Sequence, residues 1–222
     1  MRFVIVLFAV LMIASAANAQ ANPPVSDCRS TAGVSCPSMK ISICPQGDFE
    51  QIRNGCGGTN DYIWIVVRDI DGNPIPGIPV TDYWMNACDA AQALYLCLNP
   101  IAADSLTGFN GRTTFSGDFR AGGCVLTQGL CIAVQGLVLK SVYPDCATNL
   151  CLNVVIKGPD LTGPLSRPNG IVNLSDAVIF GFSLGKIPGE LGYNACCDYD
   201  GDNICGLNDL AAFNLHYQHR CP

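Results

Sequence analysis

The sequence predicts a mainly β protein, a β-sandwich followed by a small α-helical domain at the C-terminal end. Short runs of β-branched, aromatic and aliphatic residues alternate with turn residues as far as residue 157, which is typical of a sandwich of short strands. No long helical period of apolar residues occurs before residue 170, and after residue 158 the pattern changes to loops followed by short apolar segments. The chain of 222 residues is long enough for two such domains.

Residues 1–19 are predicted to be a signal peptide. Arg2 supplies a positive charge, residues 3–13 form an unbroken apolar run, and residues 17–19, Ala-Asn-Ala, fit a small-x-small cleavage site. The alternative, a membrane anchor, needs about 18–20 apolar residues, and this run is shorter. No later run is long enough to span a membrane. We therefore expect an exported protein, secreted or held at the cell surface, whose mature chain begins at Gln20.

Residues 20–157 are predicted to form the β-sandwich. Its candidate strands combine apolar and β-branched residues between Gly, Pro, Asn and Asp turns. They are residues 39–44, 62–68, 78–83, 93–98, 112–116, 131–138 and 152–157.

Two segments of this domain carry a motif. Residues 68–80 read R-D-I-D-G-N-P-I-P-G-I-P-V and residues 104–115 read D-S-L-T-G-F-N-G-R-T-T-F. Asp-Gly-Asn favours a tight turn, and the prolines block ladder pairing. The pattern resembles the bacterial immunoglobulin-like domains of surface and secreted proteins, over roughly residues 60–157, and this resemblance implies an immunoglobulin-like β-sandwich.

The first of these segments also begins like a calcium loop, with Asp69, Asp71 and Asn73 at alternate positions. The twelfth position of such a loop would be Val80, which has no oxygen ligand. A turn is therefore predicted here.

The segment 198–209, D-Y-D-G-D-N-I-C-G-L-N-D, fits the calcium-loop template. Its oxygen ligands fall at positions 1, 3, 5 and 12, and position 7 offers a backbone carbonyl, as a hard cation with six to eight oxygen ligands requires. Asn203 takes the sixth position, where a left-handed residue is needed. A solvated acidic turn is the alternative. The predicted Ca²⁺ ligands are Asp198, Asp200, Asp202, the carbonyl of Ile204, and Asp209.

The same pattern occurs earlier at an offset of 33 residues, which aligns Asp176 with Asp209 and Phe180 with Phe213. Residues 169–176, N-G-I-V-N-L-S-D, match the second half of a loop of the form D-x-N-x-D-G-x-V-N-x-x-D. Residues 158–222 thus resemble the dockerin domain, a duplicated loop–helix module of secreted bacterial proteins. The first loop departs from the pattern, since it needs an insertion and leaves two carboxylates. Its ligand candidates are Asp160, Thr162, Asn169 and Asp176, and we expect weak Ca²⁺ binding there or none.

The dockerin resemblance implies a protein partner similar to a cohesin. In that family, loop positions 10 and 11 and the following helix contact the partner. Here these positions are Leu174 with Ser175, and Leu207 with Asn208, so either repeat is able to present the contact. The alternative is that the two leucines belong to the core.

The chain contains 14 Cys, an even number, and all of them lie after the predicted signal peptide. This favours disulfides in an oxidising compartment over zinc sites, because paired C-x2–4-C knuckles do not recur. We expect seven disulfides. The short spacings favour Cys88–Cys97, Cys124–Cys131 and Cys146–Cys151, and the rest are expected to pair within two sets. These sets are Cys28, Cys36, Cys44 and Cys56, and Cys196, Cys197, Cys205 and Cys221.

Charge and residue types exclude several functions. With 12 Lys+Arg, 18 Asp+Glu and a net charge of −6, the chain lacks the basic clusters that bind nucleic acid. The two histidines, His216 and His219, lie near the C-terminus, so the β domain has none for a Ser-His-Asp triad. They are a possible metal pair, although surface positions at a helix end are more common. We expect no enzymatic activity.

The predicted function is a secreted, non-catalytic binding or assembly protein with a calcium-stabilised docking module. One alternative is a carbohydrate-binding accessory to a polysaccharide-degrading system, with aromatic residues as stacking candidates. Another is a self-assembling surface or filament subunit. The stacking candidates are Tyr62, Trp64, Tyr83, Trp84 and Tyr95.

Overall fold

The computed structural model describes residues 30–35, 39–47, 62–88, 94–97, 101–117, 119–127, 129–141, 151–161 and 167–222. The predicted signal peptide lies outside these ranges. Within them, no helix is long and apolar enough to cross a membrane. The strands are β1 (Thr31–Val34), β2 (Lys40–Ser42), β3 (Ile63–Val66), β4 (Tyr83–Ala87), β5 (Leu94–Leu96), β6 (Arg112–Phe115), β7 (Ala121–Val125), β8 (Leu130–Val134), β9 (Leu137–Val138), β10 (Lys140–Ser141) and β11 (Val155–Lys157). The helices are α1 (Leu174–Ser183), a 3₁₀ turn η2 (Ala195–Cys197) and α2 (Leu207–Leu215).

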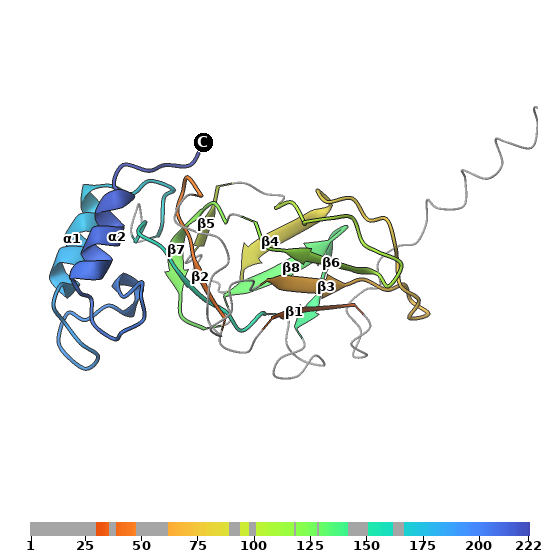
Figure 1. Cartoon of the computed structure of the whole chain (residues 1–222), viewed down its shortest axis with the longest axis horizontal. Coiled ribbons are helices and arrows are strands. Elements are labelled where there is room, and N and C mark those ends of the chain that lie inside the picture. Colours follow the sequence, from red (N-terminus) through yellow and green to blue (C-terminus); the bar gives the residue numbers. More distant parts are fainter. Residues whose placement is uncertain are drawn as a thin grey trace, which may run out of the picture.

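The predicted fold class is confirmed: the chain is mainly β, with two helices in its C-terminal part. The strands form three small sheets, in the orders β10-β1-β3-β6, β2-β11-β7-β5 and β4-β8-β9. Most neighbours pair antiparallel, whereas β1 with β10 and β2 with β11 pair parallel. Figure 1 shows the helices at one end of the molecule, next to β2, β5 and β7. The likeness of the β part to immunoglobulin-like domains stays a prediction.

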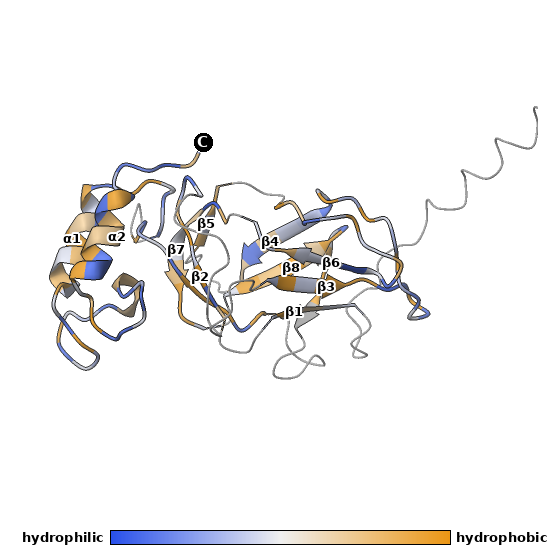
Figure 2. Ribbon diagram, in the orientation of Figure 1, coloured by the Kyte–Doolittle hydropathy of each residue, from blue (hydrophilic) through white to orange (hydrophobic). Residues whose placement is uncertain are grey.

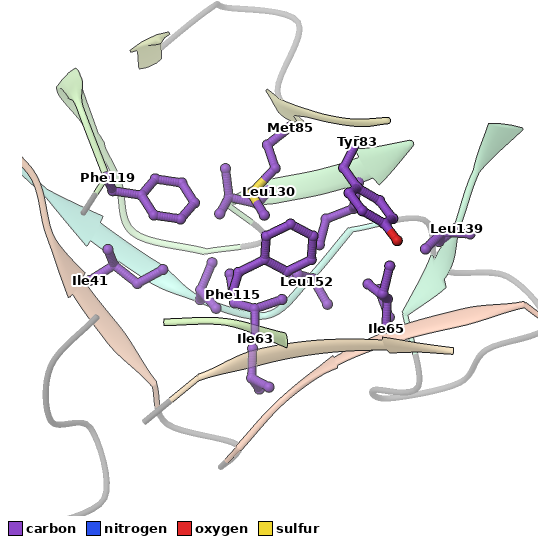
Figure 3. Packing of buried hydrophobic residues seen from close by; sticks show 14 of the residues in the cluster. Ile41, Ile63, Ile65, Tyr83, Met85, Phe115, Phe119, Leu130, Leu139 and Leu152 are labelled. Atoms are coloured by element: carbon purple, nitrogen blue, oxygen red, sulfur yellow. The ribbon is translucent and has the colours of Figure 1, made fainter. Parts of the chain in front are cut away.

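The main core lies between the sheet of β3 and β6 and the sheet of β4 and β8 (Figure 3). Residues of β3 alternate, so Ile63 and Ile65 are fully buried while Trp64 is partly exposed. This is the period of two that a strand with one buried face requires. Tyr83 of β4 meets Phe115 of β6 edge to face, with ring centroids 5.3 Å apart.

Six of the seven predicted strand segments contain observed strands. The exception, residues 78–83, is wrong, because the chain stays irregular until β4 begins at Tyr83. Pro74, Pro76 and Pro79 lack the N–H that a ladder needs. In this stretch Asp69 instead accepts hydrogen bonds from the backbone of Asp71 and Asn73, which confirms the predicted turn.

The sequence did not predict β1, β7 or β10, and of β4 it predicted only the first residue, Tyr83. β7 has the sequence A-G-G-C-V, in which two glycines weaken the strand pattern. Gly122 is required there for another reason: a Cβ at this position would overlap the carboxylate of Asp160.

The two C-terminal helices pack against each other around a second, smaller core. Phe180 of α1 and Phe213 of α2 lie 5.2 Å apart between ring centroids, and Tyr199 stacks on Phe180 at 6.2 Å. Val172 and Cys205, which differ by the predicted offset of 33, are both buried beside them.

Backbone pairing repeats with the same offset. Each of Val172 and Cys205 donates to, and accepts from, the segment that follows the other repeat's helix. The bonds are Val172 N to His219 O (2.8 Å) and Gln218 N to Val172 O (2.8 Å), and Cys205 N to Lys186 O (3.1 Å) and Gly185 N to Cys205 O (2.8 Å). The C-terminal part is therefore a structural duplication in which each repeat pairs with the other.

The observed disulfides correct the predicted local pairs. They are Cys88–Cys151, Cys97–Cys221 and Cys124–Cys196, with sequence separations of 63, 124 and 72 residues. Short spacing was misleading because strand neighbours are far apart in sequence. In the described part, Cys131, Cys197 and Cys205 form no disulfide, so the expectation that every cysteine is paired is wrong there. Cys28, Cys36, Cys56 and Cys146 lie outside the described residues.

Two of these disulfides join the β part to the helical part. Cys97 directly follows β5 and binds Cys221, beyond α2, while Cys124 of β7 binds Cys196, just before the acidic loop. The C-terminal cysteines thus do not form the closed set that was predicted. The two parts are cross-linked, and the boundary near residue 158 stays a prediction.

Candidate calcium-binding site

The acidic loop runs from η2 to the first turn of α2. Asp198 directly follows η2, and Asp209 is the third residue of α2. One carboxylate oxygen from each of four residues lies within 4.8 Å of the others: Asp198, Asp200, Asp202 and Asp209. The structure therefore brings together the four carboxylate ligands predicted for this loop.

Short-range hydrogen bonds fold the loop. Gly201 N donates to Asp198 Oδ1 at 2.7 Å, Asp202 N to Asp200 Oδ1 at 3.1 Å, and Ile204 N to Asp202 Oδ1 at 2.7 Å. Such bonds from an aspartate side chain to the backbone two or three residues further on hold the loop in tight turns. The carbonyl of Ile204, predicted as a ligand, stays a prediction.

Asn203 has a φ of +68°, in the left-handed region. This is the conformation expected at the sixth loop position, where asparagine replaces the usual glycine. The chain therefore makes the sharp turn that a twelve-residue calcium loop needs.

Asp209 ties the end of the loop to its beginning. Its Oδ1 accepts from Tyr199 N at 2.6 Å and from Asp200 N at 3.2 Å, and its Oδ2 accepts from Gly206 N at 2.7 Å. Burial raises the pKa of Asp209, and these backbone hydrogen bonds oppose that rise. A carboxylate so held is positioned before any ion arrives.

Lys157, at the end of β11, was not predicted as part of the site. Its Nζ lies 3.3 Å from Asp198 Oδ2 and also contacts the Asp198 carbonyl, and both residues are buried. One positive charge here offsets one of the four carboxylates and fixes Asp198 against the β part. Its position could not be read from the sequence, because 41 residues separate the partners.

The first loop repeats part of this geometry. Asp160 and Asp176 occupy the places of Asp198 and Asp209. The matching bonds are Leu161 N to Asp176 Oδ1 (2.7 Å), Asn173 N to Asp176 Oδ2 (2.8 Å) and Gly170 N to Asp160 Oδ2 (2.7 Å). This supports the alignment that starts the first loop at Asp160.

The first loop is nevertheless poorer in ligands. Asn169 stands where the second loop has Asp202, so it offers an uncharged amide oxygen in place of a carboxylate, and Thr162 lies outside the described residues. Asp160 is fully buried against Gly122. This burial, with the nearby charge of Asp176, raises the pKa of Asp160 to about 7, against the backbone hydrogen bonds from Asn169 and Gly170.

The donor set of the second loop fits a calcium ion. It consists of hard carboxylate oxygens, which Ca²⁺ prefers over softer ligands. Asp198 and Asp209 are buried while Asp200 and Asp202 are exposed, so the cluster is open to solvent on one side. An ion entering there would bring two positive charges among four carboxylates that otherwise repel each other.

The predicted partner residues lie on the surface. Leu174 is 68% exposed and Leu207 is 77% exposed, so the alternative that they belong to the core is wrong. Ser175 and Asn208 are exposed too.

Each leucine begins a line of exposed residues at a spacing of four, along one face of its helix. On α1 the line is Leu174, Val178 and Phe182, and on α2 it is Leu207, Ala211 and Leu215; we call these the two stripes. They are related by the offset of 33. Figure 2 shows the hydrophobic character of α1 at the end of the molecule farthest from the sheets. Both stripes could have been predicted from the sequence, because apolar residues at a spacing of four recur at the offset of 33 residues.

The aromatic candidates for sugar stacking are divided. Tyr83 is fully buried in the core, so it is unable to stack on a ligand. Trp64 donates to Val34 O at 3.3 Å, and Arg112 lies over its ring. Trp84 is 41% exposed and Tyr95 is 46% exposed.

No protein-family model matches the sequence, and no curated protein matches it. The chain is similar to two crystal structures of a type II cohesin–X-module–dockerin complex from Acetivibrio cellulolyticus. One carries an N-terminal interface mutation, with 11% identity, a TM-score of 0.30, and coverage of 86% of this chain and 97% of that chain. The other carries a C-terminal interface mutation, with 12% identity, a TM-score of 0.29 and the same coverage. This likeness is too weak to assign a family.

Proposed function

We propose that the protein is a secreted, non-catalytic assembly protein whose C-terminal module docks onto a protein partner when calcium fills the acidic loop. The observation that carries this proposal is the pair of exposed apolar stripes on helices that begin at the two loops. The described residues contain three disulfides, two of them between the β part and the helical part, and such disulfides are typical of proteins outside the cytosol.

The acidic loop and the second stripe share one helix turn. Asp209 is the third residue of α2, and Leu207, which begins the stripe, is the first. An ion held by Asp209 and the loop carboxylates would fix the start of α2 and thus the orientation of the stripe. Calcium would therefore control the docking face by ordering it, without being part of the contact.

The stripes are suited to a protein surface. Phe182 is 74% exposed and Leu215 is 73% exposed, and contiguous exposed apolar residues rimmed by polar ones mark interaction sites. The partner should offer an apolar face of its own, as a cohesin-like domain would. Because the stripes are equivalent, either repeat can present the contact.

Capture from the producing organism's culture supernatant, on the immobilised chain, tests this. We expect a protein partner to bind in calcium and to elute with EDTA. Phe182→Glu combined with Leu215→Glu should abolish capture. The matched control is Phe109→Glu, in the β part, where Phe109 is 95% exposed.

Other results of this experiment would overturn the proposal. Capture that survives the double substitution would remove the stripes from the contact. Retention by polysaccharide, indifferent to EDTA, would favour the carbohydrate-binding alternative, for which exposed Trp84 and Tyr95 are available. Recovery of the chain's own copies alone would favour self-assembly.

A further inference from the structure

The described part of the chain contains a second cluster of metal-ligating side chains, separate from the acidic loop. It consists of Cys44, just after β2, and of His216 and His219, just after α2. One ligand atom from each residue lies within 4.8 Å of the others. Cys44 is fully buried and His216 is 8% exposed. The expectation that His216 lies on the surface, as histidines at helix ends commonly do, is therefore wrong.

The segments that carry these residues are far apart in sequence but adjacent in space. Figure 1 shows the chain after α2 running back toward β2 and β5. The Cys97–Cys221 disulfide anchors this return two residues beyond His219. Cys44 Sγ lies 3.4 Å from His219 Nδ1, across a sequence separation of 175 residues.

Backbone hydrogen bonds hold all three residues in place. His216 N donates to Phe213 O at 3.1 Å, and His219 N donates to His216 O at 3.1 Å. On the other side, the carbonyl of Cys44 accepts from Gly47 N at 2.9 Å and from Ala121 N at 3.2 Å. The ligand atoms are thus presented by fixed backbone from both parts of the protein.

We propose that Cys44, His216 and His219 form a zinc-type site that joins the helical part to the β part. The separations fit tetrahedral coordination. With Zn–N of about 2.05 Å and Zn–S of about 2.3 Å, two nitrogens lie about 3.3 Å apart, and a nitrogen and a sulfur about 3.6 Å apart. The observed values are 3.3 Å between the two Nδ1 atoms and 3.4 Å between Cys44 Sγ and His219 Nδ1.

The ligand types select the metal. A thiolate and two imidazoles suit zinc and similar borderline-soft ions, whereas calcium prefers oxygen. The two sites therefore take different ions. Binding requires that Cys44 lose its proton, which passes to solvent as the metal enters.

Three protein ligands leave a fourth position open for a solvent ligand. A surface cavity of about 760 Å³ lies beside the site. Its lining includes Arg120, which bridges Cys44 through the backbone, and Arg220, which follows His219. The cavity therefore lies next to the backbone of two of the three ligands, Cys44 and His219.

Cobalt(II) is the probe, because a tetrahedral cobalt–thiolate centre is coloured and zinc displaces it. We expect the full exported chain, with its disulfides intact, to bind one cobalt per chain, with a thiolate-to-cobalt charge-transfer band and intense visible bands. Zinc should remove these bands, and excess calcium should not. Cys44→Ser should abolish the charge-transfer band, and His219→Gln should weaken zinc binding by more than roughly tenfold.

Two control variants separate this site from the others. Cys131→Ser removes a different thiol, and Asp202→Ala alters the acidic loop; both should keep the cobalt bands. Wild type that shows no charge-transfer band would overturn the proposal, and so would a band that persists in Cys44→Ser. If Cys44→Ser does not fold, His219→Gln decides, because zinc should raise the melting temperature of wild type and not of this variant. An equal zinc shift in both would overturn the proposal.

Discussion

Replacing Asp202 with alanine separates the two effects that the acidic cluster has on stability. Asp202 is exposed and its Oδ1 accepts one backbone bond, from Ile204 N at 2.7 Å. Asp198 is a poorer choice, since it is buried and pairs with Lys157. The substitution therefore removes one calcium ligand while it leaves the rest of the loop in place.

Without calcium, the variant should be nearly as stable as wild type. The cluster's ligand atoms lie within 4.8 Å of one another, so each pair of charges repels by about 0.9 kcal/mol or more in water. Removing Asp202 ends three such pairs, and salt reduces this gain to roughly 1–2 kcal/mol. The lost hydrogen bond costs about 1 kcal/mol. In EDTA the two proteins should thus differ by no more than about 1 kcal/mol.

With calcium, the two should separate. At a calcium concentration of about 100 times Kd, wild type gains about 2.7 kcal/mol, which raises the melting temperature by roughly 5–11 °C for a chain of this size. If the variant binds about 100-fold more weakly, it gains about 0.4 kcal/mol. Sites of extracellular modules bind at roughly 10⁻⁴–10⁻³ M, so millimolar calcium is needed.

Calorimetric melting of wild type, Asp202→Ala and Asp71→Ala, each in EDTA and in calcium, measures both effects. Asp71 is an exposed acid in the turn after β3, outside the cluster, so Asp71→Ala should shift with calcium as wild type does. An equal calcium shift in Asp202→Ala would show that Asp202 is not a ligand, and the absence of any shift in wild type would show that the loop does not bind calcium.

Three further predictions concern the rest of the module. Gly122→Ala should lower the free energy of unfolding by about 1–3 kcal/mol, because the new Cβ would overlap the Asp160 carboxylate. Gly117→Ala serves as the control, since a Cβ there meets no atom within 4 Å. Equal melting temperatures for the two variants would contradict the prediction. Burial raises the pKa of Asp160 from 3.8 to about 7, so between these pH values the folded chain holds a proton that the unfolded chain has lost. The free energy of unfolding in EDTA should therefore fall by up to about 4 kcal/mol as pH rises from 3.8 to about 7. Chemical denaturation should find a smaller fall in Asp160→Asn, and an unchanged fall would assign it to other groups. The thiols of Cys197 and Cys205 hydrogen-bond each other, so a disulfide oxidant should join them, and alkylation that still labels both after oxidation would contradict this.

The acidic loop could be predicted from sequence because its determinants are local. Alternate aspartates, Asn203 at the left-handed position and Asp209 in the first helix turn all act within twelve residues. The duplication was also accessible, since an offset of 33 residues relates both the apolar and the acidic positions. The structure repeats that offset in the backbone bonds of Val172 and Cys205.

What the sequence could not show are contacts between distant segments. The partners of Cys97 and Cys124 lie 124 and 72 residues away, so spacing favoured the wrong pairs. The contact of Lys157 with Asp198 and the approach of Cys44 to the histidines depend on how the helical part packs against the sheets. Strand β7 was not predicted because its two glycines weaken the strand pattern, and Gly122 is there to leave room for the Asp160 carboxylate.

Isothermal titration of the exported chain with calcium tests the calcium site without reference to unfolding, since it counts bound ions and measures their affinity. We expect saturation by one ion per chain at the acidic loop, a loss of that binding in Asp202→Ala, and little change in Asp160→Ala. No calcium binding by wild type would mean that the acidic loop is not a calcium site. Binding that Asp160→Ala removes and Asp202→Ala leaves intact would contradict the expectation as well, because the ion would then belong to the first loop.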